Sequence, residues 1–246
     1  MSKSIQFSSR SDRGKVRRKN EDYLAIDESQ AIAAIADGIG GNAFGEVASQ
    51  MAVDACMEYL TESDDELKQK PENALANAVR FANEAIIAVQ RNNSEYSKMG
   101  CTLSCFTLVG QQLVFSWVGD SRIYRIQPAL DRLEQLSKDH TLDPSKIDPE
   151  LAPRLRKSAA SILTQKVGSI LLLQPETGSV ELDTGDIVLA CTDGLTDRVN
   201  DKILLEYAVK YCDEIDKLTE QLLDRALDCG GQDNISMILA RVGGGF

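Results

Sequence analysis

The sequence is short of the residues that build zinc sites, disulfide frameworks and membrane spans. It contains one histidine, His140, and its six cysteines form no C-x-x-C pair, which argues against a zinc site. No apolar run reaches the length that spans a bilayer, and the first residues lack the apolar stretch of a secretory signal. These absences predict a cytoplasmic protein whose cysteines are reduced and buried.

Basic residues are also in short supply. The sequence has 27 Lys and Arg residues and 38 Asp and Glu residues, which gives a formal net charge of -11 and a pI of about 4.7. Nucleic acids and anionic membranes are bound mainly by Lys and Arg, so neither is expected as a partner. The apolar fraction of 43% and the charged fraction of 26% are typical of globular proteins. We predict one domain over residues 1–246.

Short apolar runs alternate with longer periodic segments along the chain. Runs bounded by Gly, Asp and Gln predict strands at residues 22–27, 31–36, 103–109, 113–118, 123–126, 179–182, 187–191 and 235–242. Apolar residues at helical spacing predict helices from residue 44 to 59, after Pro71, and over 203–211 and 215–227. This pattern indicates a fold of mixed helices and mainly antiparallel strands.

Residues 139–161 interrupt the pattern with three prolines and a basic cluster. We interpret them as an inserted flap made of loop and short helix, and the alternative is a solvated connection without a role.

Five aspartates lie at the boundaries of predicted strands, and three of them adjoin glycine: Asp22, Asp37, Asp120, Asp193 and Asp233. Any one of them alone is typical of a turn. If the strands form stacked sheets, however, the carboxylates converge at one rim and repel one another unless cations lie between them. Carboxylate oxygens suit hard ions such as Mg²⁺ and Mn²⁺, so the pattern favours a metal site.

Seven segments of the chain resemble, in the same order, the sequence motifs of one enzyme family. They are RRKNED at 17–22, IADGIGG at 35–41, VGDSR at 118–122, DHT at 139–141, LTQKVG at 163–168, TDGL at 192–195 and DNIS at 233–236. These resemble R-x-x-N-E-D, A-D-G-M-G-G, V-G-D-S-R, D-H-[ST], L-T-x-x-[LV]-G, S-D-G-L and D-N-[IA]-[ST]. The chain thus resembles the bacterial PPM-type (type 2C) metal-dependent serine/threonine protein phosphatases. The resemblance runs from about residue 10 to residue 242.

The resemblance implies an α+β fold, in which a central sandwich of two antiparallel sheets is flanked by helices on both sides. It also implies two Mn²⁺ or Mg²⁺ ions per subunit and a third, weaker ion. Asp37 would bridge the two ions, and Asp193 and Asp233 would complete the first. Asp120, with Asp193, resembles the pair that binds the third ion. Asp37 and Asp193 are therefore predicted to be catalytic.

The second ion would be held by the Gly38 carbonyl with Glu21 or Asp22. Arg17 resembles the arginine that grips the substrate phosphate, a task that suits its planar fork of donors. The implied reaction is hydrolysis of phosphoserine and phosphothreonine in proteins by direct attack of a metal-bridging water, without a phosphoenzyme.

The implied partners are phosphorylated proteins, and the enzyme would act as a monomer in signal transduction opposite a serine/threonine kinase. One departure from the family pattern is Asn42, where many relatives have histidine. Asparagine is not an acid near pH 7, which motivates one alternative, a catalytically weak scaffold that binds phosphoproteins. A second alternative is a phosphatase for small phosphomonoesters, which would differ only in the groove and the flap.

Overall fold

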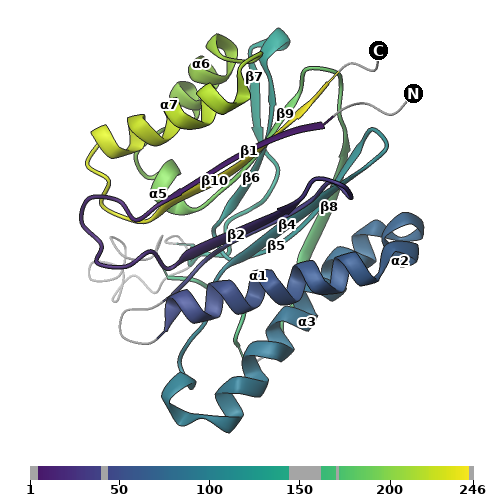
Figure 1. The fold of residues 1–246 in the computed structure, drawn as a ribbon, viewed down its shortest axis with the longest axis vertical. Helices are drawn as coiled ribbons and strands as arrows, with labels where there is room; N and C mark the ends of the chain where they lie inside the picture. Colours follow the sequence, from purple (N-terminus) through teal and green to yellow (C-terminus); the bar gives the residue numbers. More distant parts are fainter. Residues whose placement is uncertain (1–4, 40–43, 144–161, 170–171, 244–246) are drawn as a thin grey trace.

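The protein is a four-layer sandwich of helices and sheets (Figure 1). The computed structural model describes residues 5–39, 44–143, 162–169 and 172–243. Two five-stranded sheets lie face to face, with the strand orders β1-β10-β9-β6-β7 and β2-β3-β4-β5-β8. Every neighbouring pair of strands is antiparallel. The fold class predicted from the family resemblance is confirmed.

Both sheets take strands from the two halves of the chain. The first sheet consists of β1 (Ile5–Asp12), β6 (Arg122–Gln127), β7 (Arg132–Gln135), β9 (Ile187–Cys191) and β10 (Ile235–Val242). The second consists of β2 (Asp22–Asp27), β3 (Ile32–Asp37), β4 (Leu103–Val109), β5 (Gln112–Val118) and β8 (Glu176–Glu181). Strands distant in sequence therefore end side by side at each rim of the sandwich.

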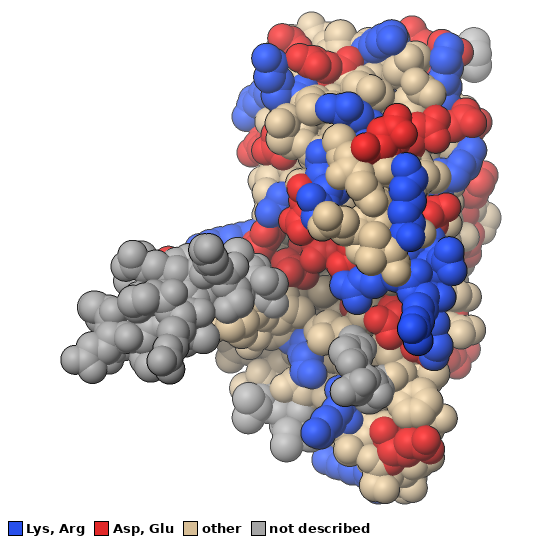
Figure 2. Space-filling model, turned by 90° about the vertical axis from the view of Figure 1, so that its left-hand side faces the viewer, with Lys and Arg blue, Asp and Glu red and all other residues tan. Residues whose placement is uncertain are grey.

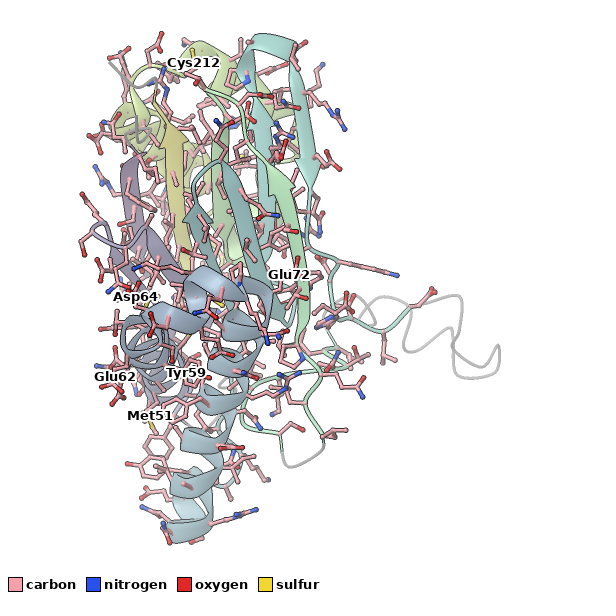
Figure 3. All side chains as sticks on the ribbon, turned by 90° about the vertical axis from the view of Figure 1, so that its right-hand side faces the viewer. Met51, Tyr59, Glu62, Asp64, Glu72 and Cys212 are labelled. Carbon is pink, nitrogen blue, oxygen red and sulfur yellow. The ribbon has the colours of Figure 1, made fainter. Side chains whose placement is uncertain are left out.

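Helices cover the outer face of each sheet. The second sheet is covered by α1 (Gly45–Glu62), α2 (Asp64–Gln69) and α3 (Pro71–Asn92), and the first by α5 (Asp193–Thr196), α6 (Asp201–Lys210) and α7 (Ile215–Asp228). Short 3-10 turns lie at Ser94–Tyr96 and Pro128–Leu130. Figure 3 shows Glu72 of α3 beside β8, where its Oε1 accepts a hydrogen bond of 2.7 Å from Ser179 Oγ.

The central strands are apolar on both faces because each face packs against a different layer. In β3, Ala33 and Ile35 pack into the core between the sheets, whereas Ile32 and Ala34 pack against the helices. Leu189 of β9 likewise belongs to the core under the other helical layer. This two-sided burial explains why these strands are continuous apolar runs in the sequence.

Most predicted elements are present, and four were missed. Strands β1 and β7 and helices α2 and α5 were not predicted, because their sequences are polar or very short. β1 has only two apolar residues, Ile5 and Phe7, yet it pairs with β10 over its full length, from Ile5 opposite Val242 to Asp12 opposite Ile235. Residues 144–161 of the predicted flap lie outside the described residues, as does Asn42.

None of the helices in the described ranges is both long and apolar enough to cross a membrane.

Candidate metal centre

One rim of the sandwich gathers the aspartates that the sequence places at strand ends. Asp22 begins β2 and lies opposite Asp37, which ends β3. Asp120 follows β5, Asp193 follows β9, and Asp233 precedes β10. Antiparallel pairing brings these ends to the same rim, and the convergence predicted from the sequence is observed.

The rim encloses a cavity of about 500 Å³. Most of the predicted site residues line it, namely Arg17, Glu21, Asp37, Gly38, Asp120, Asp193 and Asp233. Figure 2 looks onto this side of the molecule, where Asp and Glu side chains gather at mid-height with Lys and Arg side chains next to them.

Asp22 is the predicted site residue that does not line this cavity. Its side chain is buried behind the cavity wall, where Thr192 Oγ1 donates to its Oδ2 at 2.9 Å. Thr192 Oγ1 in turn accepts a hydrogen bond from the backbone N–H of Ser236 at 3.0 Å. Asp22 therefore ties β2 to the start of α5 and β10, and Glu21 is the acidic side chain of this motif that reaches the cavity.

Asp37 and Gly38 are held by backbone hydrogen bonds at the end of β3. The Asp37 N–H donates to Thr102 Oγ1 at 2.9 Å, and the Asp37 carbonyl accepts from the Thr102 N–H at 2.9 Å. The Gly38 N–H donates to the carbonyl of Glu21 at 3.0 Å. These bonds fix residues 21, 37 and 38 relative to one another before any ligand binds.

Asn234 organises the loop that carries Asp233. Its Oδ1 accepts from the N–H of Glu21 at 2.9 Å, and its Nδ2 donates to the carbonyls of Arg13 and Lys19 at 2.9 Å each. The Asn234 amide can form four hydrogen bonds, and three of them join the segment ahead of β2 to the segment ahead of β10. The sequence contained this signal in the DNIS motif, but we had not assigned Asn234 a role.

Asp120 follows a glycine turn that His140 clamps. Gly119 has φ +107°, a conformation that favours glycine. Its N–H donates to His140 Nδ1 at 3.1 Å, and its carbonyl accepts from the His140 N–H at 3.0 Å. His140 Nε2 lies 3.0 Å from Glu176 Oε1, and the ring stacks on Trp117 with centroids 6.0 Å apart. His140 therefore supports the turn that carries Asp120.

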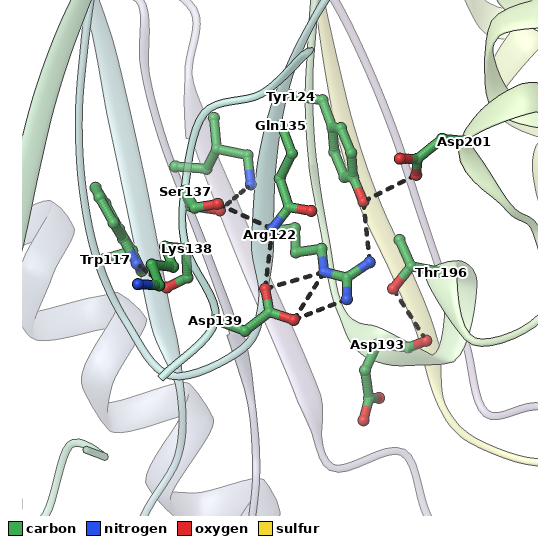
Figure 4. Close-up of polar contacts among 11 residues, drawn as sticks. Trp117, Arg122, Tyr124, Gln135, Ser137, Lys138, Asp139, Asp193, Thr196 and Asp201 are labelled. Carbon is green, nitrogen blue, oxygen red and sulfur yellow. Dashed lines mark hydrogen bonds and ion pairs between the residues drawn. The ribbon is translucent and has the colours of Figure 1, made fainter. Parts of the chain in front are cut away.

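A network centred on Arg122 supports the same region (Figure 4). Arg122 Nε lies 3.0 and 3.1 Å from the two carboxylate oxygens of Asp139, and its Nη2 donates to Asp139 Oδ2 at 2.7 Å. Its Nη1 donates to the Tyr124 hydroxyl at 3.1 Å. Arg122 and Asp139 line a second cavity of about 190 Å³, which they share with Asp120 and Asp193.

The carboxylates at the rim are held in an environment that disfavours their charge. Burial, opposed in part by hydrogen bonds from Ser236 and Thr192, raises the pKa of Asp22 to about 7. Burial and then the charges of neighbouring acids raise the pKa of Asp193 to about 7 and that of Asp37 well above its ordinary value. Burial raises the pKa of Asp120 to about 6. The site therefore concentrates more negative charge than the protein alone neutralises.

These residues fit hard divalent cations. Oδ1 of Asp22 and Oδ1 of Asp193 are buried without a hydrogen-bond partner, and a buried carboxylate oxygen is costly in free energy unless it is paired. Among the described residues, no three His, Cys, Asp or Glu side chains stand close enough to enclose an ion by themselves. The carboxylates instead surround an open cavity, an arrangement that suits ions which retain water ligands, as Mg²⁺ does.

Arg17 reaches the cavity from the segment between β1 and β2. Its Nη2 donates to Asp233 Oδ2 at 2.6 Å, and this hydrogen bond raises the pKa of the Arg17 guanidinium. Lys166, which the sequence analysis did not assign, is the second basic residue in the cavity lining.

Comparison with known proteins identifies the family. The family described as protein phosphatase 2C matches residues 13–239. The chain is 34% identical over 243 residues to the serine/threonine protein phosphatase PstP of Mycobacterium tuberculosis, with 97% of this chain and 45% of PstP covered. It therefore spans about half the length of that relative. It is 31% identical over 242 residues to the serine/threonine phosphatase stp of Listeria innocua, with 94% of this chain and 93% of stp covered.

A solved structure has the same fold. The catalytic domain of PstP, in complex with two manganese ions, superimposes with a TM-score of 0.82 at 33% identity, covering 98% of this chain and 99% of that chain. Together with the match to the family over most of the chain, this likeness shows that the protein belongs to the protein phosphatase 2C family.

Proposed function

We propose that the protein is a metal-dependent phosphatase that hydrolyses phosphoserine and phosphothreonine in other proteins. One observation carries the proposal: five carboxylates from separate strand ends and Arg17 line a single cavity. The identity to serine/threonine phosphatases over nearly the whole chain supports the same activity. Two manganese ions in the PstP catalytic domain support two Mn²⁺ or Mg²⁺ ions as the cofactor.

The ligand assignments follow the family resemblance, and the cavity lining supports them. Asp37 would be shared by two ions, Asp193 and Asp233 would complete the first, and Glu21 and the Gly38 carbonyl would hold the second. Asp120 would hold a third ion together with Asp193. Asp22 lies behind the cavity and its Oδ2 accepts from Thr192, so it would orient the rim and face the second ion through its unpaired Oδ1 and a water.

When bound, the ions would supply a water of lowered pKa as the nucleophile and would offset charge on the phosphoryl oxygens. Arg17 would bind the phosphate through its guanidinium nitrogens, and its ion pair with Asp233 would orient it meanwhile.

The described lining offers no free hydroxyl or thiol nucleophile in place of water. It contains no Ser or Cys, and Thr102 Oγ1 is already hydrogen bonded to the Asp37 N–H and to Ser121 Oγ. The nearby Cys101 is fully buried, and burial raises the pKa of its thiol far above the ordinary value. A phosphoenzyme formed on serine, threonine or cysteine is therefore disfavoured.

Further expectations belong to the same proposal. The protein would form one catalytic domain over residues 1–246, act as a cytoplasmic monomer in signal transduction, and oppose a serine/threonine kinase. The two alternatives, a scaffold and a small-molecule phosphatase, have less support. A scaffold would not need to keep the buried carboxylates, whose mutual repulsion destabilises the protein without metal.

The test is a metal-titrated assay on p-nitrophenyl phosphate and on phosphothreonine, phosphotyrosine and sugar phosphate substrates. We expect turnover only with added Mn²⁺ or Mg²⁺ and a preference for the phosphothreonine peptide. Asp193→Asn should abolish turnover, whereas Asp224→Asn on the exposed face of α7 should leave it unchanged. Turnover in excess EDTA would contradict the mechanism, and binding of phosphopeptide without release of phosphate would favour the scaffold.

A further inference from the structure

Within the described part of the chain, two basic side chains line the cavity, and they differ in their contacts. Arg17 is paired with Asp233, whereas Lys166 forms no ion pair or side-chain hydrogen bond with another residue of the described chain. Lys166 is half-buried and comes from the segment ahead of β8, so it approaches the cavity from a different wall. A lysine held at an acidic cavity without a carboxylate partner is free to bind a ligand.

The backbone around Lys166 is an extension of the sheet that carries Asp37. The N–H of Val167 donates to the Cys101 carbonyl at 2.9 Å, and the N–H of Cys101 donates to the Val167 carbonyl at 3.2 Å. Cys101 also forms a β-bridge with Gly38. The segment of Lys166 therefore lies next to Cys101, which in turn lies next to Gly38. Gly38 follows β3, at the place where the second ion is expected.

Two polar residues of α3 hold the segment from the other side. Asn83 Oδ1 accepts from the N–H groups of Gly168 and Ser169 at 2.8 and 3.2 Å. Gln90 Nε2 donates to the Gly168 carbonyl at 2.9 Å and to the Met99 carbonyl at 2.8 Å. Because these bonds satisfy the backbone, the position of residue 166 is set by the scaffold and does not depend on a ligand.

The side chain of Lys166 lies over Gly100. A Cβ at residue 100 would approach Lys166 Cδ to 3.3 Å and Cε to 3.4 Å, so the absence of a side chain there makes room for the lysine stem. The neighbouring Gln165 is engaged elsewhere, because its Oε1 accepts from the N–H of Gln174 at 3.2 Å. Lys166 is therefore the side chain of this segment that can place a charge in the cavity.

Charge in the cavity indicates what Lys166 would bind. Among the described residues, the lining has five carboxylates and two basic side chains, a net charge of -3 when all are ionised, and two divalent ions would change it to +1. Without Lys166 the metal-loaded lining would be neutral. The lysine therefore strengthens the attraction of the loaded site for a phosphate dianion, which Arg17 and the ions also attract.

We propose that Lys166 is a substrate-binding residue whose Nζ donates hydrogen bonds to the phosphoryl group, from the wall beside β4, while Arg17 binds it from the segment ahead of β2. This inference rests on the proposed phosphatase function. The ammonium suits the task, since its three donors on a flexible stem bind phosphate as a point charge.

The test measures binding of inorganic phosphate to the Mg²⁺-loaded protein by calorimetry, together with the kinetics of p-nitrophenyl phosphate hydrolysis. The variants are Lys166→Gln, which removes the charge, and Lys166→Arg, which keeps it. Lys202→Gln on the exposed surface of α6 is the matched control. Mg²⁺ affinity is measured for each variant, so that a disturbed metal centre is recognised.

We expect Lys166→Gln to weaken phosphate binding about tenfold, as for the loss of one charge-assisted hydrogen bond, and to raise KM more than it lowers kcat. Lys166→Arg should stay within about threefold of the unmodified protein, and Lys202→Gln should bind phosphate like it. A phosphate affinity unchanged in Lys166→Gln, a Lys166→Arg variant as weak as Lys166→Gln, or a loss of Mg²⁺ binding in Lys166→Gln would overturn the proposal.

The two proposals can fail separately. If the unmodified protein does not hydrolyse phosphopeptides, the proposed function fails, while the phosphate affinities still test Lys166. If it hydrolyses them and Lys166→Gln binds phosphate normally, only the assignment of Lys166 fails.

Discussion

Arg17 and Asp233 form an ion pair of 2.6 Å inside the cavity that we assign to metal and phosphate. The pair joins a residue expected to bind substrate to a residue expected to bind an ion. Both side chains remain partly exposed, 47% and 36% respectively, so the pair is reachable by solvent and contributes little to stability. The ion pair therefore matters mainly for ligand binding, because Arg17 is expected to bind phosphate and Asp233 is expected to bind a metal ion.

Replacing Arg17 should affect the two ligands in opposite directions. Arg17→Gln frees the Asp233 carboxylate and removes one positive charge, so Mg²⁺ binding is expected to tighten about two- to fivefold. The same change should weaken phosphate binding about tenfold, because a charge-assisted hydrogen bond is lost. Calorimetric titrations with Mg²⁺ and then with inorganic phosphate measure both. Weaker binding of both ligands would indicate that Arg17 only supports the loop.

The metal-free protein should become more stable as the pH falls from 8 to 6. The pKa values of Asp22 and Asp193 are raised to about 7 in the folded protein, against an ordinary value of 3.8. The folded state therefore binds more protons than the unfolded state between these values, so protonation favours folding. We expect a gain of about 1–3 kcal/mol in the free energy of unfolding across this window.

Urea denaturation in EDTA at pH 8, 7 and 6 measures this gain. Asp193→Asn should raise the stability of the metal-free protein at pH 8 and flatten its pH dependence, and saturating Mg²⁺ should reverse the trend in the unmodified protein. A metal-free protein that loses stability from pH 8 to pH 6 would show that burial and neighbouring charges do not raise the pKa values of Asp22 and Asp193 in this way.

Substitutions of His140 should separate its two hydrogen bonds. His140→Leu leaves the Gly119 N–H buried without an acceptor and is expected to cost about 1–3 kcal/mol. His140→Asn places Oδ1 near the former Nδ1 and should cost less. Since Gly119 precedes Asp120, His140→Leu should also raise the Mg²⁺ concentration that gives half-maximal activity. Chemical denaturation and metal titration test these expectations, and equal losses in both variants would contradict the acceptor role.

Asn83 is a buried polar residue on the apolar side of α3, and its substitution tests how the segment around Lys166 is held. Asn83→Leu removes the acceptor for two backbone N–H groups, and we expect a loss of about 2 kcal/mol in stability. Hydrogen exchange should then accelerate at Gly168 and Ser169. Asn77→Leu, on the same helix but away from this segment, is the control, and exchange that is equally slow in Asn83→Leu would disprove the anchoring role.

The sequence predicted the strands at the site better than those at the edges. The runs at 103–109, 187–191 and 235–242 coincide with the interior strands β4, β9 and β10, because strands buried on both faces require continuous apolar residues. The run at 22–27 coincides with β2, an edge strand that still has the apolar residues Tyr23, Leu24, Ala25 and Ile26. β1 escaped prediction because an edge strand needs few apolar residues when its partner β10 supplies the register. Tertiary pairing, not local preference, makes it a strand.

Some residues of the candidate site could likewise be predicted from the sequence, and others could not. Asp37, Asp193 and Asp233 could be predicted as candidate metal ligands from the sequence, because acidic residues at the ends of several predicted strands are visible without the fold. Asn234 and Lys166 were not identified, because their contacts lie with segments about 215 and 65 residues away in the chain. The separation of Glu21 from Asp22 also needed the fold, because alternation along a strand places neighbours on opposite sides.

The amide of Asn234 ties residues 13–21 to the last strand, and β10 lies between β1 and β9 in its sheet. A chain that is still being synthesised, or one cut ahead of residue 233, lacks both this staple and the carboxylate beside it. Such a fragment carries Arg17, Glu21, Asp37, Asp120 and Asp193 but lacks Asp233, so one carboxylate of the cavity lining is missing. The proposed metal centre can therefore be complete only after β10 has joined its sheet.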